Sequence, residues 1–437
     1  MSSRIDNHKR LGKQPLPPLL QWFWFSAYIC AFISLVSTWI FVEFMHLDRY
    51  PWDNPLFHWP SYQADFKFYS ERMKYFHQAR FFHVHGQEFA YPALIAVVYK
   101  MFYLLGSYAH AMFVWTIVMA FCAGAALFGR ALVRSGLRPL TAYGFAAVVL
   151  FTSYPVYLEL FLANMEAVVW IMTALAIWAY VTDRSWIAAA CIGIAGAMKI
   201  YPLVYLGVFL PRKQYKQFAF SILVFLGVNV ISLAILGPSI PTAYHGLSEG
   251  LRAFQQEYIY SFLKPEIGMD HSLFAILKIG LLATGHLSLL RPFLSAYLAI
   301  GALAGTLLYF FKLRFLPPTN LVMSLVIASI LLPPVSHAYT LLHLYAPWAM
   351  LALLVVQRGN KMPHKRAATW SMICFGILFT SQNYLIFHHG DFVLRVDGQL
   401  KAVTLLLLLI IAIRYPFEDT ASRNVEQAQS AEPMLAE

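Results

Sequence analysis

The sequence predicts an all-α membrane protein that crosses the bilayer about twelve times. Of its 437 residues, 59% are hydrophobic and only 12% are charged, with a mean hydropathy of +0.60. Apolar runs of about 20 residues, the length of a membrane-spanning helix, recur along the chain. Short loops rich in Lys and Arg separate many of these runs, as in cytoplasmic loops of membrane proteins. The excess of 32 Lys and Arg over 21 Asp and Glu therefore indicates membrane topology, not nucleic-acid binding.

We expect three parts in the chain. Residues 1–19 form a basic cytoplasmic N-terminus, residues 20–414 form the transmembrane domain, and the polar residues 415–437 form a disordered cytoplasmic tail. The first apolar run lacks a small-residue cleavage site, so we interpret it as a retained span. Two external loops are expected, at 44–90 and 238–270. The first is rich in aromatic residues and Pro, which favours one or two juxtamembrane helices.

The positions of the spans follow from the apolar runs and the basic residues that end them. Short apolar pieces after Tyr91-Pro92 and from His271 onward are too short to cross and are interpreted as dipping or juxtamembrane helices. The predicted spans are 20–43, 109–133, 139–154, 162–181, 216–236, 292–311, 319–332, 343–358, 367–387 and 400–413.

The apolar segment 186–210 has basic residues at both ends and Lys199-Ile-Tyr201-Pro202 in its middle. A single crossing would place one basic cluster outside, whereas two half-helices that meet at Lys199 keep both inside. Pro202 supplies the break, because it lacks the N–H donor and disfavours α-helix at Tyr201. An ammonium at this depth costs about 2.5 to 3.5 kcal/mol. We expect Lys199 either to bind a phosphate or to pair with Glu166 for structural reasons.

Asp65 lies in a polar helical stretch of the first external loop, at the membrane surface where a lipid-borne substrate can reach it. From the residues alone, a helix N-cap and a catalytic carboxylate are equally open interpretations. Asn164 and Glu166 begin a span and can face the same cavity as Lys199. Their polar groups also suit the ordinary interface at a span end.

Two histidines lie at the outer end of another span. A spacing of six does not place His337 and His343 on one helical face, so a two-histidine metal site is not predicted. We expect one of them, with His337 favoured, to contact phosphate or substrate hydroxyls; a structural role is the alternative. The four cysteines fall in apolar runs and predict no disulfide framework. Phosphate-binding, zinc and dinucleotide motifs are absent from the sequence, so a lipid-linked donor is expected instead of a nucleotide sugar.

Several stretches of the chain resemble the GT-C membrane glycosyltransferases, and among them glycosyltransferase family 87, the polyprenyl-phosphate-mannose-dependent alpha-mannosyltransferases. The similar stretches follow the family's order over nearly the whole chain. They are Asp65-Phe-x-x-Tyr69, Tyr91-Pro92, Ala195-Gly-Ala-Met-Lys199-Ile-Tyr201-Pro202, His271-Ser272-Leu273 and Pro333-Pro334-Val-Ser336-His337. The chain departs from the family pattern at Leu162-Ala163-Asn164 and at Asp270-His271, which leaves the sugar and the acceptor open.

The resemblance implies a GT-C fold and an inverting transfer on the outer face of the cytoplasmic membrane. A polyprenyl-phosphate sugar, with mannose as first candidate, would donate to a hydroxyl of a glycolipid or lipid-linked glycan of the cell envelope. The residues implied are Asp65 as general base, Lys199, Tyr201 and His337 at the donor phosphate, and Asn164, Glu166, His271, His343 and Tyr69 around the acceptor. No cofactor, metal site or nucleic acid is implied, and a need for divalent metal ions is left open.

Two other functions need a similar scaffold. A lipid transporter or flippase also uses a broken helix and a buried cation, but it predicts inverted repeats and polar residues near both faces. A ligase or polymerase of surface glycans predicts several arginines in a large external loop, where Arg252 is the one candidate. Because the candidate polar groups gather on the predicted external side, the sequence favours the transferase.

Overall fold

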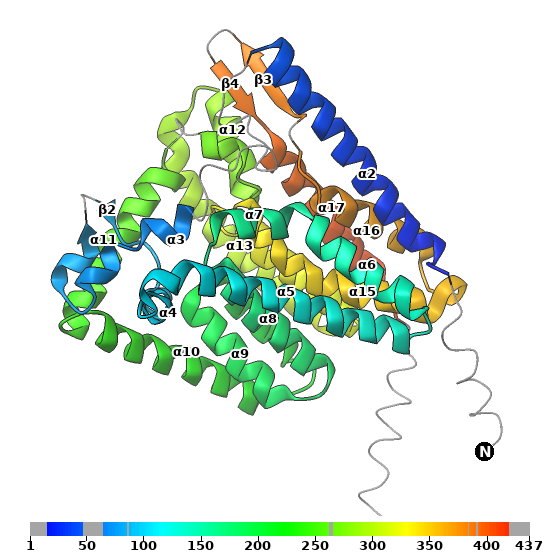
Figure 1. The fold of residues 1–437 in the computed structure, drawn as a ribbon, viewed down its shortest axis with the longest axis horizontal. Coiled ribbons are helices and arrows are strands. Elements are labelled where there is room, and N and C mark those ends of the chain that lie inside the picture. The colour runs from blue at the N-terminus through cyan, green and yellow to red at the C-terminus, as the bar shows by residue number, and fades with distance from the viewer. Residues whose placement is uncertain are drawn as a thin grey trace, which may run out of the picture.

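The protein is a bundle of helices with two small hairpins (Figure 1). The computed structural model describes residues 15–46, 64–84, 87–261, 265–382, 384–389 and 392–418. Most of the predicted N-terminal segment, most of the predicted C-terminal tail and residues 47–63 of the first external loop lie outside the described residues.

The helices are α2 (Pro18–Trp39), α3 (Ala64–Phe68), α4 (Ala93–Tyr103), α5 (Ala109–Arg134), α6 (Pro139–Thr152), α7 (Tyr154–Leu162), α8 (Glu166–Val181), α9 (Ser185–Met198), α10 (Tyr215–Leu236), α11 (Ile240–Phe254), α12 (Leu273–Ala283), α13 (Leu290–Phe311), α14 (Pro318–Leu331), α15 (Tyr345–Arg358), α16 (Lys365–Leu378) and α17 (Asp397–Arg414). Short 3₁₀ or π segments include η1 (Ile40–Phe44), η2 (Arg72–Tyr75), η3 (Ala79–Phe82), η5 (Tyr201–Val208), η6 (Gln255–Ile259) and η10 (Ala338–Leu344).

Two antiparallel hairpins complete the fold. One pairs β1 (His83–Val84) with β2 (Gln87–Glu88), and the other pairs β3 (Ile386–His389) with β4 (Phe392–Arg395). In Figure 1 the second hairpin lies beside α2 at the top of the view. The expectation of purely helical structure is therefore corrected at these two places. These strands have two or four residues, which are too few for a clear period-2 pattern in the sequence.

Many of the helices are long and apolar enough to cross a membrane. Within the described residues these are Pro18–Phe44, Gly106–Arg134, Tyr215–Leu236, Leu287–Phe315 and Ala338–Arg358, with α6 and α7 as a sixth candidate bent by 52°. Shorter apolar helices are α4, α8, α9, α12 and α14. The protein is thus an all-α polytopic membrane protein in its main architecture, and the count of twelve crossings stays a prediction.

The outward faces of the long helices are apolar. On α13, Ile300, Leu303 and Phe311 are each more than 60% exposed. A continuous surface of this kind is unfavourable in water and matches the hydrocarbon core of a bilayer. The exposed side chains therefore identify α13 as a lipid-facing helix.

The N-terminal helix packs along the C-terminal half of the chain, with α2 lying along α16 (Figure 1). A Cβ atom at Gly376 would lie 2.1 Å from Ser26 Oγ, so only glycine permits this close approach. Aromatic rings extend the contact inward, with Phe23 5.4 Å from Trp348 and 6.0 Å from Phe379. These contacts join the two ends of the chain.

The predicted break at Lys199 is confirmed. The helix α9 ends at Met198, Lys199 is extended (φ −145°, ψ 140°), and the 3₁₀ segment η5 follows. The second half is 3₁₀ and not α-helical. Pro202 stands in the first turn of η5, where its missing N–H leaves no internal hydrogen bond unmade.

Candidate active site

A short helix, α3, holds Asp65 through its aromatic neighbours. Phe66 is fully buried, and its ring lies 4.7 Å from that of Tyr103 and 4.6 Å from that of Phe113. Tyr69, one turn further on, packs its ring 5.1 Å from Tyr99. A helix of five residues is not stable alone, so these contacts set its position. Asp65 itself remains half-buried.

Asn164 connects Asp65 to the start of α8. The preceding helix α7 ends at Ala163 in the left-handed conformation (φ 51°, ψ 52°). Asn164 Nδ2 donates to Asp65 Oδ2 at 2.6 Å, while its Oδ1 accepts from the Glu166 backbone N–H at 2.8 Å. One side chain thus caps a helix and orients a carboxylate from a distant segment. This contact is one that an N-cap role for Asp65 would not require.

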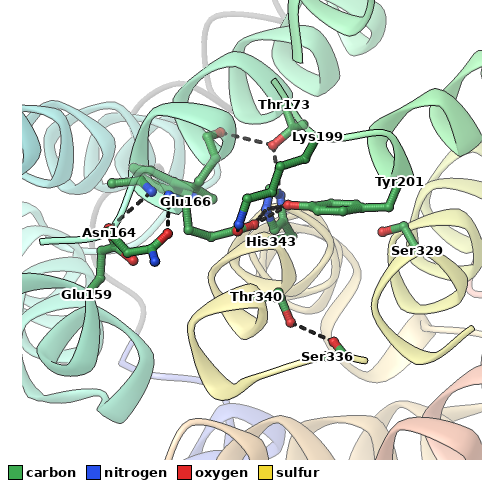
Figure 2. Close-up of polar contacts among 12 residues, drawn as sticks. Glu159, Asn164, Glu166, Thr173, Lys199, Tyr201, Ser329, Ser336, Thr340 and His343 are labelled. Atoms are coloured by element: carbon green, nitrogen blue, oxygen red, sulfur yellow. Dashed lines mark hydrogen bonds and ion pairs between the residues drawn. The ribbon is translucent and has the colours of Figure 1, made fainter. Parts of the chain in front are cut away.

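Glu166 is the centre of a buried polar cluster (Figure 2). Its side chain is fully buried and forms an ion pair with Lys199. Its Oε1 accepts from the Tyr201 hydroxyl and lies 2.8 Å from His343 Nε2. On the other side of the imidazole, His343 Nδ1 lies 2.9 Å from Thr173 Oγ1. A buried carboxylate needs compensation of this kind, and here Lys199, Tyr201 and His343 supply it.

Two tyrosine rings enclose the ammonium of Lys199. Its Nζ lies 5.5 Å from the centre of the Tyr91 ring and 5.0 Å from that of Tyr339. Cation–π contacts at these distances stabilise a partly desolvated ammonium. The expected pairing of Lys199 with Glu166 is present. Because an ammonium has three N–H donors and its side chain stays 13% exposed, the pairing leaves phosphate binding open.

Asp65 and Lys199 act on each other electrostatically. Burial raises the pKa of the Asp65 carboxyl, and the Asn164 hydrogen bond and the Lys199 charge oppose this rise in part. The net direction is upward, so the carboxylate binds a proton more strongly than an exposed aspartate does. This shift favours general-base catalysis, because a base is most effective when its pKa is near the pH at which the enzyme works.

His337 and Lys199 both lie near the ring of Tyr339. Its ring is 5.8 Å from Tyr339 and 6.2 Å from Tyr258, and it lines a small polar pocket. Burial lowers the pKa of His337 to about 4, with further lowering by the charges of Lys199 and Lys278. The imidazole is therefore neutral near pH 7 and can donate one hydrogen bond to a phosphate oxygen.

His271 is fully buried, and its recorded hydrogen bonds are structural in geometry. Its Nε2 lies 3.0 Å from both Thr340 Oγ1 and Ser336 Oγ. Its backbone N–H donates to the Ser336 carbonyl at 2.9 Å. These contacts tie the start of α12 to η10, the segment that also carries His343. His271 thus lies behind the Glu166 cluster, and its expected contact with an acceptor stays a prediction.

The comparison with known families agrees with this arrangement. The model of glycosyltransferase family 87 matches residues 89–334, more than half of the chain. The chain belongs to glycosyltransferase family 87. The matched range includes Asn164, Glu166 and Lys199, whereas Asp65 precedes it and His337 follows it. The protein is thus a family 87 chain that carries several helices long and apolar enough to cross a membrane.

One curated relative shows a more distant similarity. It is described as a polyprenol-phosphate-mannose-dependent alpha-(1-2)-phosphatidylinositol pentamannoside mannosyltransferase of Mycobacterium tuberculosis (strain CDC 1551 / Oshkosh). The two chains are 26% identical over 152 residues, which is 34% of each. The chain therefore matches about a third of this relative's length. No solved structure matches the chain.

The sequence did not predict some residues that lie next to the Glu166 cluster. Tyr91 was part of a family-like stretch, yet its position over Lys199 depends on how α4 packs. Thr173 is seven residues after Glu166, which is two helical turns along the same face of α8. That spacing could have suggested a shared environment. The contact of Thr173 with His343 required the fold, because η10 is distant in sequence.

Proposed function

We propose that this family 87 protein is an inverting glycosyltransferase that moves mannose from a polyprenyl-phosphate donor to a hydroxyl of a glycolipid or lipid-linked glycan. The reaction takes place on the outer face of the cytoplasmic membrane. The observation that supports this most is that Asp65 and Lys199 belong to one polar cluster, in which Asn164 and Glu166 connect them.

In this mechanism, Asp65 is the general base. The acceptor hydroxyl transfers its proton to the Asp65 carboxylate, and the oxygen forms a bond to the anomeric carbon of the sugar. The bond from that carbon to the phosphate oxygen breaks, and its electron pair leaves with polyprenyl phosphate. Attack opposite to the leaving group converts a β-linked donor into an α-linked product. A positioned base contributes on the order of a hundred- to ten-thousandfold in rate.

Lys199 stabilises the leaving phosphate, on which negative charge grows in the transition state. Glu166 and the two tyrosine rings hold the ammonium in place, so no reorganisation is required during the reaction. His337 donates a hydrogen bond as a neutral imidazole. Tyr201 contributes through its hydroxyl, which in this structure bonds to Glu166 and lies 2.6 Å from His343 Nε2.

The acceptor approaches Asp65 from the side of Asn164 and Tyr69. Asn164 donates a hydrogen bond to the carboxylate, and Tyr69 directly follows α3, the helix that carries Asp65. Glu166 and His343 are placed deeper and serve the acceptor indirectly, by fixing Lys199 and the turn at Asn164. His271 has an indirect role, because it bonds to Thr340 of η10, the segment that carries His343.

The test is a transfer assay with membranes that contain the protein. Membranes are supplied with radiolabelled polyprenyl-phosphate mannose, and in parallel with the corresponding glucose donor, and labelled glycolipids are extracted and digested with α-mannosidase. We expect a new α-linked mannolipid from the mannose donor alone. Movement of the labelled donor across the membrane without any labelled product would instead identify a flippase. Repeating the assay with EDTA measures the requirement for a divalent ion.

A further inference from the structure

Glu159 lies directly behind the turn that carries Asn164. It is fully buried near the end of α7, and Figure 2 shows it beside Asn164. Its Oε1 accepts from the Ala167 backbone N–H at 3.2 Å, and its backbone carbonyl accepts from the Ala163 N–H at 2.7 Å. These two hydrogen bonds thus join Glu159 to residues on either side of Asn164 in the sequence.

The turn between α7 and α8 needs such support. Ala163 adopts a left-handed conformation, which costs a non-glycine residue about 1 to 2 kcal/mol. The first amides of α8 also have no partner within the helix. Asn164 accepts from the amide of Glu166, and Glu159 accepts from that of Ala167. The side chains of Asn164 and Glu159 thus accept hydrogen bonds from the first two amides of α8 and stabilise the turn that precedes this helix.

We propose that Glu159 is a positioning residue for the base: it fixes the 163–166 turn so that Asn164 Nδ2 stays bonded to Asp65. This inference rests on the proposed function, in which Asp65 is the base. Glu159 does not contact the substrate. Its effect passes through the Asn164 amide, which both orients the Asp65 carboxylate and holds its proton affinity down.

A competing role for Glu159 is direct proton transfer, since its second carboxyl oxygen, Oε2, is buried without a hydrogen-bond partner among the described residues. Glutamine separates the two roles. The Glu159→Gln side chain keeps an oxygen that accepts from the Ala167 N–H, but it cannot take up and release a proton. Positioning therefore survives in this variant, whereas direct proton transfer is lost.

The experiment compares Glu159→Ala with Glu159→Gln in the full-length purified protein, using polyprenyl-phosphate mannose. Displacement of a catalytic group by about 1 Å can cost a hundredfold. We expect Glu159→Ala to lower kcat about ten- to hundredfold with the donor KM unchanged. We also expect the acid limb of its pH–rate profile to move to higher pH, because Asp65 loses the Asn164 bond. Glu159→Gln should retain kcat within about threefold and the wild-type limb.

Val156→Ala is the matched control, since Val156 is also buried on α7 but is not part of the turn. It should leave the acid limb unchanged. If Glu159→Ala does not fold, Glu159→Asp, whose carboxyl reaches less far, takes its place. A second readout is the combination with Asn164→Ala. If Glu159 acts through Asn164, the double variant is no slower than Asn164→Ala alone.

A wild-type acid limb and kcat in Glu159→Ala would overturn the inference, as would equal losses in Glu159→Gln and Glu159→Ala. Strict additivity with Asn164→Ala would do the same. These outcomes differ from a failure of the proposed function, which appears as full activity of Asp65→Asn. Loss in Asp65→Asn with no effect of Glu159→Ala rejects the positioning role alone.

Discussion

In the described part of the chain, the ionic clusters around Asp397 and Glu166 are both buried, and they are built differently. At the start of α17, Asp397 bonds to Arg395 at 2.5 Å and pairs with Lys401 at 3.3 Å, and all three side chains are at most 6% exposed. These partners come from one stretch of seven residues. In the candidate active site, Glu166 at the start of α8 pairs with Lys199, which follows the end of α9. The Lys199 side chain stays 13% exposed, and its ammonium lies near two tyrosine rings.

Under the proposed function, the first cluster has a structural role and the second a role in transfer. The Asp397 cluster lies at the beginning of α17, and the ring of Tyr154 from α7 lies 4.9 Å from Lys401 Nζ. A cluster assembled from distant segments holds its members only while the fold is intact, and here it leaves one cation and one carboxylate accessible. Buried ion pairs add little net stability by themselves. A buried ion pair at the junction of several segments therefore favours a catalytic role over a stabilising one.

The largest effect is expected from Asp65→Asn. The amide has the same shape but cannot accept a proton, so transfer should fall about a hundred- to ten-thousandfold while the protein still folds. The matched control is Glu249→Gln on α11, a partly exposed carboxylate whose ion pairs are with His83 and His245. Initial rates with purified protein and polyprenyl-phosphate mannose measure both. Full activity of Asp65→Asn would exclude it as the base.

The next effect tests whether Lys199 acts beyond its pairing with Glu166. Lys199→Ala alone leaves the buried Glu166 carboxylate without its cationic partner, which destabilises by about 3 to 5 kcal/mol. Combining Lys199→Met with Glu166→Gln removes both charges. If Lys199 stabilises the leaving phosphate, the double variant still loses about a hundred- to thousandfold in kcat. Recovery of transfer in the folded double variant would reduce Lys199 to a structural partner.

The C-terminal cluster should respond in stability and not in catalysis. Asp397→Ala leaves two buried cations without their shared carboxylate, and we expect a loss of about 3 to 5 kcal/mol. Thermal unfolding in detergent measures this loss, and kcat of the folded fraction should be unchanged. Asp183→Ala, which removes the exposed partner of Arg212, should barely shift unfolding. A specific loss of kcat in Asp397→Ala would contradict the division between the two clusters.

The smallest effect concerns pH. Burial raises the pKa of Asp65 above its ordinary value of 3.8, and the base must be ionised to act. Activity should therefore fall as pH decreases through this raised pKa, so the acid limb lies above pH 3.8. Asp270, whose pKa burial raises to about 6, is the other carboxyl to examine. The limb should persist in Asp270→Asn, and its disappearance there would assign it to Asp270.

Much of the helical architecture followed from the sequence. Apolar runs and basic loops predicted α5, α10 and α13 closely, and charge at both ends of one run predicted the break at Lys199. Local signals were sufficient for these features because the bilayer imposes length and polarity on each span separately. The hairpins were missed, since β3 and β4 are strands of only four residues each and give no clear period-2 signal.

The candidate site was predicted only in part. Asp65, Asn164, Glu166 and Lys199 were selected from polar residues in unexpected places, and the structure brings them into contact. His337 and His271 are not part of that group. The ring of His337 lies near Tyr339, and His271 is hydrogen-bonded to Thr340 of η10. Their residue types were visible in the sequence, but their neighbours were not.

The amino-acid sequence alone was enough to predict a polytopic membrane protein and a broken helix at Lys199. It also identified a few polar residues in and next to apolar segments, where burial of a polar group costs free energy. The tertiary structure decided which of these residues meet. The physical reason is that hydropathy and helix breaking act within about 20 consecutive residues, whereas the Asp65–Asn164–Glu166–Lys199 contacts join segments that only the packing of α3, α4, α8 and η5 brings together.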